Sequence, residues 1–205
     1  VKNNYNDAET YGGRIALGIE LDDSWTITPS LMGQYQKADG SYAQERGLKY
    51  QTIQYNPEGS VDKWWNAGLT IQGKLGNWDV TYAGGYLKRN DRTQSDYSDY
   101  SYFYDAISGY GAFFYDNNGN YVSPNQYIQG KDRYNKKFQE FRIASPSDKR
   151  LRLIAGLFWQ RQSHNIEQNY IIDDIANSIT VTGTESNIWL TEQQRVDRDQ
   201  AVVGE

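Results

Sequence analysis

The stretch Trp64–Arg89 reads WWNAGLTIQGKLGNWDVTYAGGYLKR and contains two segments in which apolar and polar residues alternate. The first segment ends at Leu75 and the second begins at Trp78. Because successive side chains of a strand point to opposite faces, this alternation predicts two strands that each have one apolar face. Gly76 and Asn77 separate them and predict a two-residue hairpin turn of type I′ or II′. Each strand keeps its alternation for about ten residues, the length of a tilted strand that crosses a bilayer.

The same alternation predicts further strands on both sides of this hairpin. We expect strands at 13–21, 25–36, 65–75, 78–87, 138–145, 150–161 and 195–204. Pro29 has no backbone N–H to donate, so we expect a bulge or a locally unpaired site there. The chain is rich in Tyr and Gly and poor in Leu, Ile and Val, which favours an all-β fold. We therefore predict an antiparallel meander of about seven strands.

The connections between the predicted strands alternate between short and long. Short turns are expected at 22–24, 76–77 and 146–149, and long connections at about 38–63, 90–135 and 162–194. The longest should contain a minor hairpin that pairs 112–115 with 121–122 around Asn118 and Gly119. Alternate connections of a meander lie at the same end, so one end is trimmed and the other carries long loops. This asymmetry is typical of outer-membrane barrels, which have short periplasmic turns and long extracellular loops.

Aromatic residues bracket the apolar face of the predicted strands. Trp25 and Trp78 each follow a short turn, and Tyr35, Tyr86 and Trp159 come about eight to ten residues later on the same face. These positions fit two interfacial girdles around an apolar band about 25 Å tall. The residues expected to face lipid are Leu17, Ile19, Leu31, Leu69, Ile71, Val80, Leu153 and Leu157. Those expected to face the lumen and whatever fills it are Arg14, Glu20, Lys74, Arg142 and Arg152.

Composition excludes several classes of protein. The chain has 205 residues, a net charge of -5 and no cysteine, so disulfides and thiolate metal sites are ruled out. No basic segment is present, which argues against a nucleic-acid partner. No apolar run reaches the length of a membrane-spanning helix, although hydropathy is uninformative for barrel strands. Both ends lie in polar sequence without a signal peptide, and we expect them to be cuts in a longer protein.

The sequence offers little catalytic chemistry, and we predict no enzyme activity, no catalytic residue, no metal site and no cofactor. His164 is the only histidine, so neither a nucleophilic triad nor a two-histidine metal site is expected. Carboxylates pair at 22–23, 96 and 99, and 173–174, where solvation of turns and loops is the simpler explanation. The segment DNNGN at 116–120 resembles a calcium loop, but its Gly comes too early and a hairpin turn accounts for it.

Aromatic residues crowd the longest predicted loop. Exposed rings with polar groups provide rigid contact area for sugars, chelates or flat organic ligands. The alternative is that they pack the loops against one another. The candidate ligand-binding residues are Tyr97, Tyr100, Tyr102, Tyr104, Tyr110 and Phe113.

Two other classes of protein share parts of this pattern. A soluble β-sandwich also alternates apolar and polar residues, with the apolar face turned inward, so a soluble surface-binding module for carbohydrate or adhesion is the alternative function. A glycosidase that uses loop carboxylates would require a cleft with two carboxylates placed for catalysis. The asymmetry of the loops favours the barrel over both.

Several runs together resemble the middle barrel strands and loops of TonB-dependent outer-membrane receptors of Gram-negative bacteria. They are ETYGGRIALGIEL, WTITPSLMGQYQKADGSYAQERG, YNPEGSVDKWWNAGLTIQGKLGNWDVTYAGGYLKR, SDYSDYSYFYDAISGYGAFF, FQEFRIASPSDKRLRLIAGLFWQRQ and IWLTEQQRVDRDQAVVGE. The resemblance covers essentially the whole chain, and the hairpin FRIASPSDKRLRLIAGLFWQRQ is its most family-like part.

The resemblance implies a 22-stranded barrel in the outer membrane, plugged by an amino-terminal domain. Such receptors bind a scarce nutrient, such as a siderophore-like chelate, haem, cobalamin or an oligosaccharide, and import it with energy relayed by TonB. The 205 residues would be part of that barrel domain, with the plug, the TonB box and the remaining strands lying outside them. About seven strands are too few to close this barrel, so the segment alone is expected neither to transport nor to form a closed pore.

Overall fold

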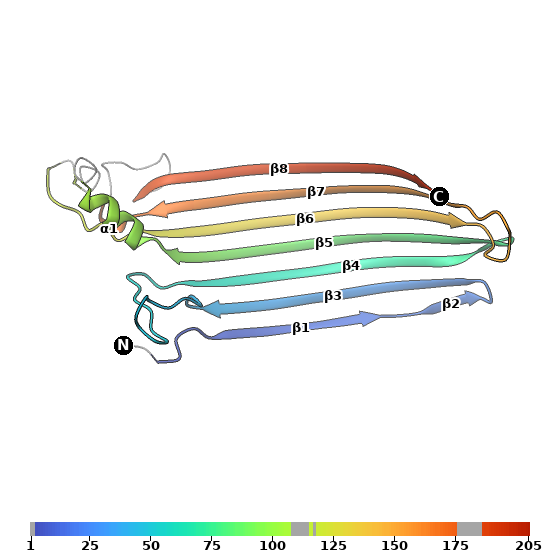
Figure 1. The fold of residues 1–205 in the computed structure, drawn as a ribbon, viewed down its shortest axis with the longest axis horizontal. Coiled ribbons are helices and arrows are strands. Elements are labelled where there is room, and N and C mark those ends of the chain that lie inside the picture. The colour runs from blue at the N-terminus through green and yellow to red at the C-terminus, as the bar shows by residue number, and fades with distance from the viewer. Residues whose placement is uncertain (1–2, 108–114, 117, 176–185) are drawn as a thin grey trace.

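The computed structural model describes residues 3–107, 115–116, 118–175 and 186–205, and these form one antiparallel sheet with a short helix at one end (Figure 1). The elements are β1 (Ala8–Ala16), β2 (Ile19–Asp22), β3 (Trp25–Asp39), β4 (Gly59–Leu75), β5 (Trp78–Asp96), α1 (Ser98–Ala106), β6 (Tyr127–Ala144), β7 (Ile154–Ile171), η2 (Asp173–Ile175) and β8 (Asn187–Gly204). The strands pair in chain order, and β2 pairs with β3 alongside β1. The predicted all-β antiparallel meander is therefore confirmed.

The first predicted strand is divided opposite Pro29. Ala16 pairs with Ser30 and Ile19 pairs with Ile27, while the Leu17 N–H donates to the Pro29 carbonyl at 3.1 Å between them. Because Pro29 has no N–H to return a hydrogen bond, the ladder is interrupted there. The predicted irregularity at Pro29 is confirmed.

Two of the three short turns match the sequence closely. The Asp22 carboxylate accepts hydrogen bonds from the backbone N–H groups of Ser24 and Trp25 at 2.7 and 3.0 Å. At the second turn Gly76 has a φ of +63° and Asn77 has a negative φ, which is the pattern of type II′.

The third turn is longer than expected and includes residues that were predicted to lie on a strand. Ser145 N–H donates to the Leu153 carbonyl, and the Leu153 N–H donates to the Ser145 hydroxyl, both at 2.8 Å. β7 consequently begins at Ile154 instead of Arg150. Arg152 and Leu153 lie in the turn, so neither is placed on the lumen-facing or lipid-facing side of a strand as predicted.

Every strand that borders a long loop extends further into it than predicted. The loop after β3 covers 40–58, the segment between β5 and β6 covers 97–126, and β7 continues to Ile171. At this end both faces of the sheet are polar, so the alternation of hydropathy disappears while the backbone hydrogen bonds continue. For the same reason β1 begins at Ala8, five residues before the predicted strand at 13–21.

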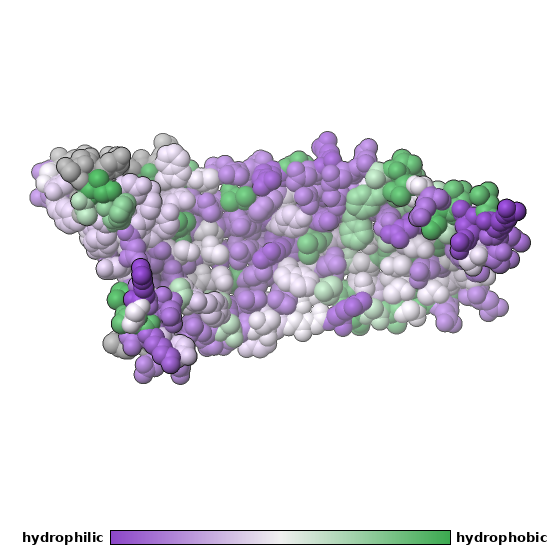
Figure 2. Space-filling model, viewed as in Figure 1, coloured by the Kyte–Doolittle hydropathy of each residue, from purple (hydrophilic) through white to green (hydrophobic). Residues whose placement is uncertain are grey.

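The sheet has no apolar core of its own among the described residues. On the apolar face Ile15, Leu157 and Val202 are 67, 57 and 84% exposed, and Leu17, between β1 and β2, is 58% exposed. The buried apolar cluster of the described residues lies under the loops and consists of Val122, Ile172 and Ile175 with Ile188 packed against it. In the view of Figure 2, hydrophilic residues extend along the whole sheet, and hydrophobic ones gather mainly toward the short turns. Within the described ranges, no helix is both long and apolar enough to cross a membrane.

Candidate functional site

The strand ladder separates the predicted lumen-facing residues from the predicted lipid-facing ones. Partners directly opposite each other share a face, and Glu20, Thr26, Gln72, Thr81 and Arg142 form one such line across the sheet. Arg14, which is opposite Met32, and Lys74, which is opposite Asp79, lie on the same face as that line. The opposite face carries Ile19, Leu31, Leu69, Ile71, Val80 and Leu157.

Aromatic residues of the apolar face form an oblique row that is interrupted at β6, where Lys137 and Gln139 occupy the corresponding positions. The row consists of Tyr11, Tyr35, Trp65, Tyr86 and Trp159. The rings of Tyr11 and Tyr35 are 6.4 Å apart between centroids, and those of Trp65 and Tyr86 are 5.1 Å apart. We refer to these five residues as the outer aromatic row.

The slope of this row follows from the register. Along the ladder Tyr35 on β3 is level with Asn165 on β7, four strand spacings away. Trp159 lies six residues from Asn165, toward the short turns. Six residues of about 3.4 Å, set against four spacings of about 4.8 Å, correspond to an angle of about 45° between the row and the direction of the hydrogen bonds. That angle matches the tilt of strands in transmembrane barrels, whose girdles run level with the membrane.

A second aromatic pair borders the other side of the apolar band. Trp25 and Trp78 lie next to the short turns on the same face, ten and eight residues from Tyr35 and Tyr86 along their strands. The ring of Trp25 lies over Gly73, where a Cβ atom would come within 2.2 Å of it. A glycine at position 73 therefore lets this indole lie flat on the sheet.

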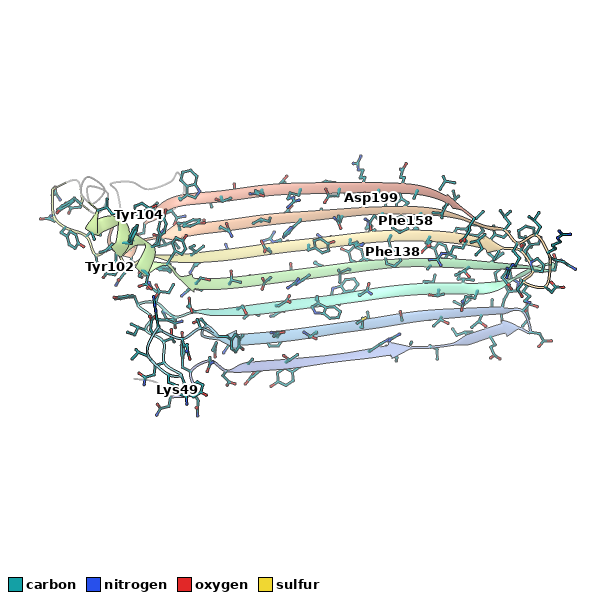
Figure 3. The ribbon with its side chains drawn as sticks, viewed as in Figure 1. Lys49, Tyr102, Tyr104, Phe138, Phe158 and Asp199 are labelled. Carbon is teal, nitrogen blue, oxygen red and sulfur yellow. The ribbon has the colours of Figure 1, made fainter. Side chains whose placement is uncertain are left out.

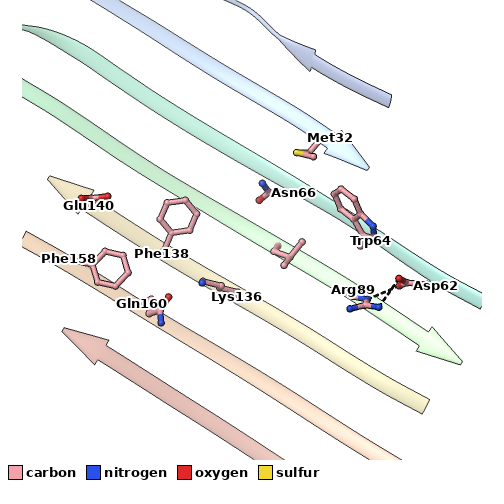
Figure 4. A pocket seen from close by; sticks show the side chains of 11 residues that line it. Met32, Asp62, Trp64, Asn66, Arg89, Lys136, Phe138, Glu140, Phe158 and Gln160 are labelled. Carbon is pink, nitrogen blue, oxygen red and sulfur yellow. Dashed lines mark hydrogen bonds and ion pairs between the residues drawn. The ribbon is translucent and has the colours of Figure 1, made fainter. Parts of the chain in front are cut away.

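The polar face contains an open hollow of about 700 Å³ that no sequence pattern predicted (Figure 4). In the wall of the hollow Arg89 forms a two-point ion pair with the Asp62 carboxylate, with Nε and Nη2 each 2.9 Å from a carboxylate oxygen. Phe138 lies over Gly85, where a Cβ atom would be 2.5 Å from the ring. The hollow is lined by Met32, Asp62, Trp64, Asn66, Leu87, Arg89, Lys136, Phe138, Glu140, Phe158 and Gln160. Its aromatic members occupy polar-face positions, so alternation gave no reason to select them.

At the loop end, a partly buried polar cluster holds α1 against the ends of the strands. The Asp96 carboxylate accepts hydrogen bonds from the Tyr55 N–H at 2.6 Å and from the Ser98 N–H and hydroxyl at 3.1 and 2.7 Å. It also accepts from the Asn56 side-chain amide at 3.1 Å. Ser98 is fully buried, and its hydroxyl accepts from the Gln126 N–H at 3.2 Å. This cluster joins the loop after β3 to both ends of the longest connection.

The predicted ligand-binding tyrosines lie on α1 and beside its start, at the loop end of the molecule (Figure 3). Tyr97, Tyr100 and Tyr104 follow a helical spacing, and their rings are 4.8 and 4.5 Å apart between successive centroids. Tyr170, at the end of β7, meets Tyr97 edge to face at 6.0 Å. We call these four residues the tyrosine cluster. Tyr100 is 49% exposed, so the cluster presents ring surface to solvent.

The remaining candidates are placed differently. Tyr102 contacts Tyr55 with ring centroids 5.1 Å apart and donates its hydroxyl hydrogen to Asn125 at 2.9 Å. It therefore packs the loops together outside the tyrosine cluster. Tyr110 and Phe113 lie outside the described residues. Tyr170 was missed because it is 66 residues from Tyr104 in sequence, and only the pairing of β6 with β7 brings the two segments to the same end.

The loop carboxylates Asp116 and Asp173 accept hydrogen bonds from neighbouring groups of the chain. The Asn120 side-chain amide donates to the Asp116 carboxylate at 2.9 Å, and the backbone N–H groups of Asn120 and Asn118 donate to it as well; these hydrogen bonds lower the pKa of that carboxyl. The bridge Tyr115–Tyr121 forms the described part of the predicted minor hairpin. Asp173 accepts the Tyr127 hydroxyl at 2.8 Å. In the part of the chain that the structure describes, no three His, Cys, Asp or Glu residues are grouped to hold a metal ion.

Comparisons with protein-family models, with curated proteins and with solved structures found no match to this chain. Its function must therefore be inferred from the placement of its residues. Two exposed features bear on it: the apolar band between the aromatic rows, and the tyrosine cluster at the loop end.

Proposed function

We propose that this chain is part of the barrel wall of an outer-membrane receptor that captures a scarce nutrient and imports it with energy from TonB. The tyrosine cluster and the loops around it would contact the nutrient outside the cell. The plug and the TonB-binding segment would come from parts of the protein outside these 205 residues. In this proposal the receptor forms and breaks no covalent bond.

The observation that carries the proposal is the exposed apolar band with an oblique aromatic row on one side and tryptophans on the other. Exposed leucine and valine side chains in water forgo about 1.5 to 3 kcal/mol each relative to burial. A soluble sandwich would cover them with a second sheet, and the described residues form a single layer. Lipid would cover the band instead, with aromatic rings at both of its interfaces.

The polar face has the properties expected of the inner wall of a plugged barrel. It carries many charged and amide side chains, and the hollow offers both the Arg89–Asp62 pair and the ring of Phe138. A folded plug domain could fill this hollow with side chains of matching polarity. The same face in a soluble module would be solvated.

Spin labelling tests which face meets lipid. Because the chain has no cysteine, single cysteines label uniquely within it. We expect labels at Leu31→Cys and Leu157→Cys, in the full-length protein in lipid vesicles, to collide with oxygen more often than with a water-soluble nickel chelate. Labels at the adjacent positions Met32→Cys and Phe158→Cys should show the lower oxygen preference of the polar face. Equal accessibility to the nickel chelate within both pairs, or a folded monodisperse protein in plain buffer, would favour the soluble binding module.

Substitution of the tyrosine cluster tests ligand contact. Each ring lost from a stacked contact should weaken binding by about 0.5 to 1.5 kcal/mol, or roughly twofold to tenfold. We expect this for Tyr100→Ala and Tyr104→Ala, measured by fluorescence titration with a ferric hydroxamate chelate, haemin, cyanocobalamin and a maltooligosaccharide. Tyr42→Ala is the matched control, because Tyr42 is 70% exposed in the neighbouring loop and outside the cluster. One of these compounds should bind the unmodified protein. If its affinity is the same for Tyr100→Ala, Tyr104→Ala and Tyr42→Ala, the cluster only packs the loops.

A further inference from the structure

We propose that a belt of outward-facing cations beside the outer aromatic row binds the phosphate groups of anionic lipids in the outer leaflet. We define the cation belt as Lys63, Lys88, Lys137, Arg161 and Arg198. The inference rests on the proposed membrane location. It adds a lipid partner of stated charge, which that proposal does not require.

The belt follows the aromatic row from strand to strand. Lys63 lies two residues from Trp65, Lys88 two residues from Tyr86, and Arg161 two residues from Trp159, each toward the loop end. A spacing of two keeps each cation on the same face as its aromatic neighbour. On β6 and β8 the corresponding cations are Lys137 and Arg198, and all five side chains are exposed. Five successive strands therefore carry a cation one step beyond the apolar band.

Two of these cations are held directly against aromatic rings. The Lys63 ammonium is 5.1 Å from the centroid of the Tyr35 ring, and the Lys137 ammonium is 5.6 Å from that of Tyr86. Cation–π contacts of this kind fix the ammonium groups at the level of the aromatic row. If that row marks the membrane interface, the charges lie at the depth of the lipid headgroups.

The belt lacks compensating charge within the described residues. None of its five members forms an ion pair there, whereas Lys37 on β3 pairs with Asp39 at 2.9 Å and Lys131 pairs with Glu167 at 2.7 Å. Lys137, Arg161 and Arg198 are moreover direct cross-strand neighbours. Like charges opposite each other destabilise a sheet, so three in a line favour an anion between them. Phosphate headgroups would supply that anion at the required depth.

Binding of short-chain lipids to the full-length protein in a neutral detergent tests the belt. The probes are dioctanoyl phosphatidic acid, dioctanoyl phosphatidylcholine and inorganic phosphate. The belt variant combines Lys63→Gln, Lys88→Gln, Lys137→Gln and Arg161→Gln. The control variant removes four cations from the polar face through Arg14→Gln, Lys74→Gln, Lys136→Gln and Arg195→Gln. Lys136 and Lys137 are adjacent in sequence and differ in the face they occupy.

We expect the unmodified protein to bind phosphatidic acid at least tenfold more tightly than phosphatidylcholine, and the belt variant to lose that preference. Each cation near a membrane surface contributes about fivefold in affinity, so the loss of four is well within detection. The control variant should keep the preference. Three results would each overturn the lipid belt. They are a belt variant that keeps the unmodified protein's preference for phosphatidic acid, a control variant that loses this preference as fully as the belt variant does, and binding of inorganic phosphate as tight as that of phosphatidic acid.

The same samples separate the two proposals. If the protein inserts into phosphatidylcholine vesicles but shows no preference for phosphatidic acid, the belt is wrong and the receptor proposal stands. If it stays folded and monodisperse without detergent and does not insert, the membrane location is wrong and the belt is overturned with it.

Discussion

Replacing Leu69 by Arg is expected to lower the free energy of unfolding from a lipid bilayer by about 2 to 4 kcal/mol, the cost of a cation near the midplane of a barrel wall. Leu69 lies on β4 between Trp65 and Leu75, opposite Pro29 and Gly84. Those neighbours are small, and Leu69 remains 37% exposed on the apolar face. A charge at this position would therefore meet lipid directly. Denaturant titration of the full-length protein in vesicles measures the effect.

The matched control is Thr70→Arg, one residue further along the same strand. Thr70 lies on the polar face, opposite Thr28 and Ala83, where a guanidinium stays solvated. Its cost should be below about 1 kcal/mol, as for ordinary surface substitutions. If Leu69→Arg is no more destabilising than Thr70→Arg, the apolar band does not contact hydrocarbon.

Replacing Asp96 by Ala is expected to lower the free energy of local opening at the loop end by about 2 kcal/mol. It should also weaken the binding of any ligand that contacts the tyrosine cluster. Four hydrogen bonds converge on this carboxylate, and hydrogen bonds to a charged acceptor are the strongest of their class. Loss of the carboxylate would remove the acceptor of the Ser98 backbone N–H at the start of α1, whereas the buried Ser98 hydroxyl could still donate to the Gln126 carbonyl at 3.2 Å. Hydrogen exchange at the amides of Tyr55 and Ser98 reports the opening.

Asp99→Ala is the control, because it removes the same charge three residues further on, from an exposed position in the first turn of α1. It should cost less than about 1 kcal/mol through the helix dipole alone. Amide exchange that responds equally to the two substitutions would show that Asp96 does not hold the loop end together.

Asp96 also predicts how the loop end responds to acid. Burial alone would raise the pKa of its carboxyl, but the hydrogen bonds from Ser98, Tyr55 and Asn56 outweigh burial and bring the pKa below its usual value. This group lies ten residues beyond Tyr86, outside the apolar band. Because the folded pKa is depressed, its stabilising contribution is complete above the ordinary carboxyl pKa of about 4 and is lost as the pH falls through the folded value. In Asp96→Ala, amide exchange at Tyr55 and Ser98 should lack this acid-induced step.

The sequence predicted strands correctly only where their two faces differ in polarity. Trp65–Leu75 was found from its alternation, whereas Gly59–Lys63 of the same strand was assigned to a loop. Around Lys63 neither face is consistently apolar, because Val61 and Trp64 lie on opposite faces among polar residues, so the hydropathy signal vanishes although Tyr35 and Asn90 still pair with Lys63. At the other end, Leu151 and Leu153 continued the alternation of β7 into a turn that Ser145 closes.

The candidate site divides in the same way. The density of aromatic residues in the longest loop was enough to select Tyr97, Tyr100 and Tyr104. They lie together because α1 places residues with helical spacing on one face. Tyr170 and the Asp96 cluster depend on contacts between segments far apart in the chain, which no local pattern encodes. The hollow around Phe138 also depends on Gly85 of the neighbouring strand.

The sequence by itself determined the all-β meander, the polarity of the two faces and the end that carries the long loops, because these follow from the alternation of neighbouring residues and the lengths of the connections. Only the tertiary structure decided the strand register, and with it the oblique course of the aromatic row and the cation belt beside it. Register is fixed by backbone hydrogen bonds between residues distant in the chain, and those bonds continue where side-chain polarity no longer distinguishes one face from the other.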